Sequence, residues 1–292
     1  KSNKNRSFMK KLFSSFGYLV CLLCGWLAFV PRCADAQESV VVEKYADKPI
    51  RGVIIAGAFD LQLQQADGAS KQVGAKVEIL RELEDKLVFE YTEDGFVRLA
   101  FKDDMTKYFT GSKKKPQAWV TVSELTYLNV TGASTVVGTG RCSSPGKLRL
   151  MTSGNASVNL LSCSAGEIDI EASGTSDLSD VKLSATGRTT IETSGTAKVR
   201  GELGTAEMTL RMTGVSGVVL SGSAADADWN VGGTSSADLE RLETEHVTAE
   251  VTGMGQVKAC VTGNGTAQVS TMGSFRYTGA GRMTGKGVKR LD

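Results

Sequence analysis

Glycine residues in the C-terminal part of this 292-residue chain recur at a nearly constant interval. Seven of them are separated by 22, 20, 21, 19, 19 and 20 residues. They are Gly132, Gly154, Gly174, Gly195, Gly214, Gly233 and Gly253. Most follow a phrase such as Ile170-Glu171-Ala172-Ser173, and residues 53–57 (VIIAG) look like an earlier copy. A fixed period of about 20 residues indicates a solenoid in which each repeat is one coil.

Within each repeat, apolar and polar residues alternate over three to five positions, which is typical of a β-strand with one buried face. Strands this short bury little surface alone, but stacked coils would pair them and give a continuous core. Glycine would occupy the corners, where the backbone needs a positive φ. We therefore expect an all-β fold, a right-handed parallel β-helix with about 20-residue coils. An antiparallel β-sandwich is the alternative, although Asn264-Gly265 is the only hairpin-type turn signal.

Residues 37–127 differ in composition from residues 128–292. The later segment holds 25 of the 33 glycines but only 3 of the 19 aromatic residues, as expected for a narrow interior. We interpret 128–292 as regular coils and 37–127 as opening coils with a charged insertion at residues 102–116. A helical turn at residues 80–87 would cap the end of the stack, because an open sheet edge needs protection. Lys113 to Lys115 are interpreted as a solvated loop, and the role of the charged arm is left open.

The first 36 residues are predicted to be a signal peptide. Several Lys and Arg residues precede an uncharged, mostly apolar run over residues 12–30, and Ala34-Asp35-Ala36 follows, with cleavage expected before Gln37. The alternative is a transmembrane anchor. Cleavage would leave a chain that is exported and not integral to the membrane.

The charge balance changes when this leader is set apart. The whole chain carries +2, of which residues 1–36 carry +5, so residues 37–292 carry −3. A mildly acidic exported chain argues against nucleic acid and against anionic lipid as its partner.

Three cysteines lie beyond the leader, and two of them are one period apart. Cys142 and Cys163 would occupy neighbouring coils, about 5 Å apart, which suits a disulfide. Two buried thiols acting as small apolar residues are the alternative.

The repeated Thr/Ser-Gly phrases, the leader and the segment Val53-Ile-Ile-Ala-Gly57-Ala-Phe-Asp60-Leu-Gln-Leu63 together resemble one family, the head GIN domain proteins (DUF2807), described as "putative auto-transporter adhesins". The resemblance covers residues 50–285. It implies a right-handed β-helix, export in a Gram-negative bacterium to the periplasm or cell surface, and adhesion, with no catalytic residues and no cofactor. The chain shows no stretch after the repeats that could form a membrane β-barrel translocator, so "auto-transporter" would not describe it literally.

Few residues could carry catalysis. The single histidine, His246, has no second His for a metal site and no nucleophile elbow near it, and we interpret it as part of a surface turn. The best carboxylate cluster is Asp226, Asp228, Asp238 and Glu240. Glu167, Asp169 and Glu171 alternate on one strand and would share a solvated outer face. We expect no catalytic residue, no metal and no cofactor.

The sequence therefore favours an exported, non-enzymatic, adhesin-like protein that presents a β-helix face to an unidentified envelope protein or glycan. Two alternatives are a polysaccharide lyase or hydrolase on the same fold, which would use Asp226 and Asp228, and a structural or stress-related envelope component. The ligand-binding residues are not identified by sequence.

Overall fold

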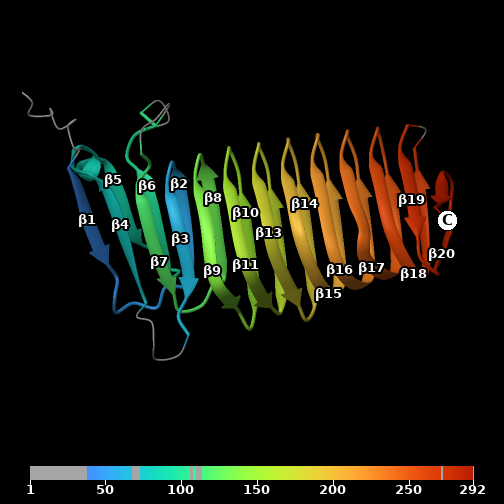
Figure 1. Ribbon diagram of the computed structural model, residues 1–292, viewed down its shortest axis with the longest axis horizontal. Coiled ribbons are helices and arrows are strands. Elements are labelled where there is room, and N and C mark those ends of the chain that lie inside the picture. Colours follow the sequence, from blue (N-terminus) through green and yellow to red (C-terminus); the bar gives the residue numbers. More distant parts are fainter. Residues whose placement is uncertain (1–37, 68–72, 106–107, 110–113, 271, 292) are drawn as a thin grey trace, which may run out of the picture. The chain divides into compact units, whose positions relative to one another are not determined.

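The computed structural model describes residues 38–67, 73–105, 108–109, 114–270 and 272–291. Residues Ser39–Asp292 form one compact unit. This unit is a β-solenoid of about 8 turns with roughly 20-residue coils, and 68% of the structure is strand (Figure 1). The fold class predicted from the glycine period is confirmed.

Each regular coil contributes one strand before its glycine corner and one strand after it, and both pair in parallel with the neighbouring coils. We call the outer surface of the first set of strands face A and that of the second set face B. The strands under face A are β6 (Phe96–Phe101), β2 (Gly52–Gly57), β8 (Tyr127–Gly132), β10 (Lys147–Thr152), β12 (Glu167–Ala172) and β14 (Arg188–Thr193). The strands under face B are β7 (Gln117–Val122), β3 (Asp60–Gln65), β9 (Thr135–Ser143), β11 (Ser157–Ala165) and β13 (Asp177–Ala185).

From residue 198 onward, a face-B strand continues directly into the face-A strand of the next coil. These long strands are β15 (Lys198–Met212), β16 (Gly217–Val231), β17 (Ser236–Val251) and β18 (Gln256–Val269). Three short strands follow: β19 (Ser274–Thr278), β20 (Arg282–Thr284) and β21 (Val288–Arg290). β19 and β21 continue face B, whereas β20 continues face A.

The core is a set of stacked side-chain columns. Because the coils are in register, Leu150 pairs with Leu128 on one side and with Ile170 on the other, and all three are buried. The one tryptophan of the regular coils, Trp229, is fully buried and in register with Ala249, whose small side chain leaves room for the indole. Aliphatic columns of this kind explain why the repeats contain so few rings.

The seven ladder glycines form the corners between the two columns of strands. Their φ angles lie between 61° and 88°, a region that favours glycine. They also stack on one another: a β-carbon at Gly174 would lie 2.7 Å from the carbonyl oxygen of Gly154. The amide of Thr175 donates to that same oxygen at 2.7 Å, so the corners are hydrogen-bonded from coil to coil.

The order of coils in the stack differs from their order in the sequence. β2 and β3 lie between the coil formed by β6 and β7 and the coil formed by β8 and β9. Residues 53–57 therefore do form a copy of the repeat, and Gly57 is in register with Gly132. The segment between β3 and β8 supplies the preceding coil and the end of the stack.

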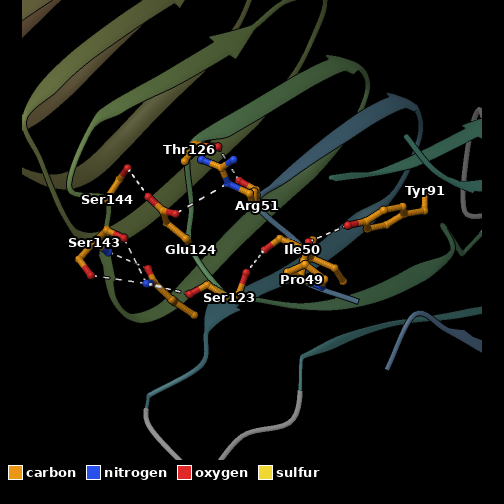
Figure 2. Close-up of polar contacts among 10 residues, drawn as sticks. Pro49, Ile50, Arg51, Tyr91, Ser123, Glu124, Thr126, Ser143 and Ser144 are labelled. Atoms are coloured by element: carbon orange, nitrogen blue, oxygen red, sulfur yellow. Dashed lines mark hydrogen bonds and ion pairs between the residues drawn. The ribbon is translucent and has the colours of Figure 1, made fainter. Parts of the chain in front are cut away.

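A polar cluster fixes the junction where these distant segments meet (Figure 2). Ser123 donates to the carbonyl of Ile50 from both its amide (2.8 Å) and its hydroxyl (2.9 Å). Thr126 makes the same pair of bonds to the carbonyl of Arg51, at 2.8 and 2.9 Å. Glu124 accepts a hydrogen bond from Ser144 at 2.9 Å and lies 3.8 Å from the Arg51 guanidinium. These bonds satisfy backbone carbonyls where the segment between β7 and β8 meets the residues that precede β2.

The N-terminal end of the stack is closed by antiparallel strands. β4 (Gly74–Leu80) pairs with β7, β1 (Ser39–Lys44) pairs with β4, and β5 (Leu87–Tyr91) pairs with β6, all antiparallel. A short 3-10 helix, η2 (Arg81–Lys86), joins β4 to β5 and buries Leu83, in the segment where a capping helical turn was expected. Aromatic side chains fill this end; Phe59 and Phe101 stack at 4.9 Å between ring centroids.

Candidate functional site

Alternation along the strands decides which side chains reach face A. In β12, Ile168 and Ile170 are buried, so the acidic residues Glu167, Asp169 and Glu171 between them point outward, as predicted from their spacing. Because neighbouring strands are in parallel register, the outward positions of successive coils line up in straight rows, about 4.8 Å from one coil to the next.

Three rows cover face A in the C-terminal coils. Row 1 contains Arg188, Glu207, Asp226, His246, Asn264 and Arg282. Row 2 contains Thr190, Thr209, Asp228, Thr248, Thr266 and Thr284. Row 3 contains Glu192, Arg211, Asn230, Glu250 and Gln268. Row 2 has short side chains and lies between two rows whose side chains are mostly longer.

Rows 1 and 2 line a hollow of about 710 Å³ over β15 to β18 and β20, which we call the face-A trough. A second hollow of about 420 Å³ lies over β8 to β15, on row 3 and its N-terminal continuation. Face A is thus a long, shallow, polar surface with hydroxyl groups repeated along its floor. Such a surface can hydrogen-bond an extended ligand that runs parallel to the axis of the stack.

Ion pairs between neighbouring coils neutralise much of face A. Arg188 lies 2.6 Å from Glu207, Arg211 lies 3.1 Å from Glu192, and Lys147 lies 2.6 Å from Asp169. The hydrogen bond to Glu207 raises the pKa of the Arg188 guanidinium. These pairs are exposed, so each adds little stability, but together they fix the arrangement of charge on the face.

Asp226 and Asp228 are placed differently from these acids. They lie two residues apart on β16 and line the face-A trough, and neither makes an ion pair with any residue that the structure describes. The other two members of the predicted acidic cluster, Asp238 and Glu240, belong to the face-B part of β17, so the structure does not bring the four carboxylates together.

His246 is not part of a turn, contrary to the expectation from sequence. It lies within β17, in row 1, in register with Asp226 and Asn264. β17 runs without interruption from Ser236 to Val251, so the strand passes from face B to face A with His246 inside it. No group of three or more His, Cys, Asp or Glu side chains is arranged to hold a metal within the described ranges.

The two cysteines one period apart lie in register on β9 and β11, and both side chains are buried. The structure holds them as free thiols, the second of the two alternatives above. A hydrogen bond to Cys142 and burial raise the pKa of the Cys163 thiol. Whether oxidation joins them remains a prediction. Cys260, half-buried on β18, pairs with Glu243 and Thr278 instead.

The basic end of the charged arm is held against the solenoid. Lys115 donates to the carbonyl of Ala133 at 2.7 Å and lies 3.7 Å from Asp60. Lys114 lies 3.5 Å from Glu78. These two lysines are therefore paired within the fold rather than presented as a free patch. The predicted signal-cleavage residues Ala34, Ala36 and Gln37 lie outside the described residues, as does Lys113.

The rows of face A were not recognised in the sequence, although a signal for them was present. Row 2 begins with residues that each stand five positions before a ladder glycine: Thr190, Thr209, Asp228 and Thr248. Aligning the repeats on their glycines would have revealed that polar row. In the part of the chain that the structure describes, no helix is both long and apolar enough to cross a bilayer.

The described residues thus form a β-solenoid with a long polar face. Residues 179–281 match the model of the family DUF2807, described as "Putative auto-transporter adhesin, head GIN domain". The resemblance recognised in the repeats is confirmed over that segment. No curated protein matches the chain.

Solved structures with the same fold come from Parabacteroides. A "putative adhesin" from Parabacteroides merdae is 15% identical, with a TM-score of 0.61 over 87% of this chain and 96% of the other. A "putative adhesin" from Parabacteroides distasonis is 17% identical, with a TM-score of 0.60 over 88% and 98%. A "putative lipid binding protein" from Parabacteroides distasonis is 16% identical, with a TM-score of 0.58 over 88% and 98%. At these identities the likeness shows the fold alone.

Proposed function

We propose that this chain is an exported, non-enzymatic, adhesin-like protein that binds an extended ligand along the face-A trough. The observation that carries the proposal is the row of hydroxyl side chains in register, one per coil except at Asp228, flanked by rows of Arg, Asn, Glu and Gln. A periodic ligand could contact successive coils through the same kind of hydrogen bond. A linear glycan has that periodicity and that hydrogen-bonding capacity.

Location in the cell envelope is part of the same proposal. Its support is the leader over residues 1–36, the family match over residues 179–281 and the neighbours described as adhesins. We place the protein at the surface or in the periplasm of a Gram-negative bacterium. Protease treatment of intact cells separates these locations, because a solenoid that resists external protease is not displayed at the surface.

A glycan array and a pull-down from cell envelopes test the ligand. The variant Thr209→Val/Thr248→Val keeps the shape of row 2 and removes two hydroxyls, whereas Thr135→Val makes the same change on face B. We expect bound glycan to be lost with the first variant and kept with the second. Equal binding by both variants would place the ligand elsewhere, and capture of a protein through face A would replace the glycan as ligand. The proposal is overturned if neither assay yields a ligand.

The polysaccharide lyase or hydrolase remains as a second candidate, because Asp226 and Asp228 both line the face-A trough without an ion-pair partner among the described residues. It requires that the protein cleave an acidic polysaccharide and that Asp226→Asn/Asp228→Asn abolish cleavage. Release of no oligosaccharide by the wild-type protein would exclude this candidate for the polymers assayed.

A further inference from the structure

Exposed apolar side chains gather in one region of the C-terminal coils. Six large apolar side chains are strongly exposed among the residues that the structure describes, and four of them lie at a glycine corner or at the start of a face-B strand between the end of β15 and the start of β19. They are Val215, Val219, Met254 and Met272, with exposed fractions of 60%, 39%, 50% and 71%. Single exposed apolar residues need no explanation, but a group on one edge does.

Their positions follow from the register of the corners. Val215 and Met254 each come directly after a ladder glycine, and their amides donate to the carbonyl of the preceding ladder glycine at 2.7 and 2.8 Å. Ser274 is in register with Gln256, so Met272 lies next to Met254 in the same corner row. The two methionines therefore project side by side from the edge of the stack.

A row of cations runs beside this edge on face B. Lys258 is in register with Arg276, and Arg276 is in register with Lys289. Lys258 and Arg276 each stand four residues after a methionine, on the strand that begins two residues after it. We call Met254, Met272, Lys258, Arg276 and Lys289 together the basic corner.

The cations of the basic corner are less paired than several cations of the earlier coils. There, Lys182 pairs with Glu202 at 2.9 Å and Arg188 pairs with Glu207 at 2.6 Å, each time across adjacent coils. Lys258 has one distant partner, Glu240 at 4.0 Å, while Arg276 and Lys289 make no ion pair within the described ranges. Like charges opposite one another on adjacent strands destabilise a sheet, so an external anion would relieve this arrangement.

The net charge of the chain hides this segregation. Residues 256–291 contain six Lys and Arg and no Asp or Glu, whereas residues 37–255 carry a net −8. The net charge of −3 over residues 37–292, which argued against anionic partners, is the sum of an acidic segment, a basic segment and the final Asp292. A local field of this kind acts on a partner within about a Debye length, roughly 8–10 Å, whatever the total charge.

We propose that the basic corner binds the surface of a bilayer that contains anionic phospholipids. The cations would lie at the level of the lipid phosphates, and the two methionines would enter the interface between headgroups and acyl chains. A soluble polyanion or an acidic protein could satisfy the cations but would leave no reason for the methionines to project beside them. This surface lies on a different side of the corner from the face-A trough, so both sites could be occupied together.

Vesicle co-sedimentation of the full chain tests the proposal. Binding is compared between phosphatidylcholine vesicles and vesicles that also contain phosphatidylglycerol. Every variant keeps residues 1–37, so any contribution of that segment to binding is the same in all of them. We expect preferential binding to the anionic vesicles, and its loss in 0.5 M NaCl. Arg276→Gln/Lys289→Gln should weaken that preference about 25-fold, from about fivefold per cation near an anionic surface.

Two further variants make the test specific. Met254→Ser/Met272→Ser keeps all charges and should weaken binding to anionic vesicles severalfold. Lys147→Gln/Arg149→Gln removes two cations that are ion-paired on face A, outside the trough, and should leave binding nearly unchanged. Backbone amides at the start of β18 and in β19 should exchange hydrogen more slowly when anionic vesicles are present.

Three results would each overturn the proposal. One is equal weakening by the face-A and basic-corner charge variants, which would indicate a nonspecific effect of net charge. Another is full binding by the methionine variant together with tight binding to soluble polygalacturonate, which would make the partner a polyanion. The third is salt-sensitive self-association, abolished by Arg276→Gln/Lys289→Gln, without preference for anionic vesicles.

Discussion

Gly132 stacks directly on Gly57, although the two glycines are 75 positions apart in the sequence. A β-carbon on Gly132 would collide with the Gly57 carbonyl, as it would at each later step of the ladder. The first regular coil therefore pairs with β2, a strand from a much earlier part of the sequence. This contact joins the N-terminal end of the solenoid to its periodic part.

The ladder glycines should not tolerate a side chain. Gly174→Ala would place a β-carbon 2.7 Å from a backbone oxygen at a residue with a φ of 69°. We expect a loss of about 1–3 kcal/mol in the free energy of unfolding, from left-handed strain and displacement of the corner. Urea denaturation measures it. Gly204→Ala is the matched control, since a β-carbon there meets nothing within 4 Å, and equal effects at both sites would contradict the role of the ladder.

Trp229 should be important for its volume and not for its indole N–H. The side chain is fully buried, and its Nε1 has no hydrogen-bond partner in the structure. Trp229→Ala should cost about 3–5 kcal/mol by leaving a cavity. Trp229→Phe should cost about 1 kcal/mol or less, because removal of an unsatisfied polar group offsets the smaller ring. Equal losses for the two variants in thermal or urea unfolding would show that the N–H is satisfied in solution.

Cys142 and Cys163 should form a disulfide when the protein is oxidised. Their residues pair in register on adjacent strands, and the bridge would close one coil. Mass spectrometry after mild oxidation should show one bridged peptide pair, formed equally well in Cys260→Ser. A stabilisation of about 3 kcal/mol is expected for a loop of this length. Alkylation of both Cys142 and Cys163 after oxidation would leave the pair as buried free thiols.

Tyr108 should ionise unusually late. Its hydroxyl donates to Glu82, and this hydrogen bond raises the pKa of Tyr108 to about 12. Because the pKa is raised on folding, the contribution of this bond to stability is complete below pH 10 and is lost between pH 10 and about 12. Absorbance titration of tyrosinate should show a group near pH 12 that Tyr108→Phe removes and Glu82→Gln shifts toward 10. An unchanged titration in Glu82→Gln would show that another group holds the proton.

The periodic part of the fold could be predicted because its information is repeated. Each copy of the phrase before Gly174 or Gly195 reports the same corner and the same strand, so small irregularities do not hide the pattern. The position of residues 52–65 in the stack could not be predicted, because it depends on single bonds such as that from Ser123 to the Ile50 carbonyl. A local sequence pattern identifies a coil but does not say which neighbour it will pair with.

The candidate surfaces were harder to predict for a related reason. Asp226 and Asp228 were identified by their charge, but the hydroxyl row beside them exists only because β15 to β18 are in register. The basic corner was masked by averaging charge over the whole chain. His246 was misplaced because the polar residues Glu243, Thr244 and Glu245 before it looked like a turn, whereas β17 continues through them.

The position of β2 and β3 between two later coils has a consequence for synthesis. Both neighbours of this coil, β6–β7 on one side and β8–β9 on the other, are translated after it. The growing chain must therefore extend about 90 residues beyond Gly52 before that coil is sandwiched on both sides. Assembly therefore cannot proceed as a simple addition of turns from the N-terminus, and the coil formed by β2 and β3 keeps an exposed edge until the later strands pair with it.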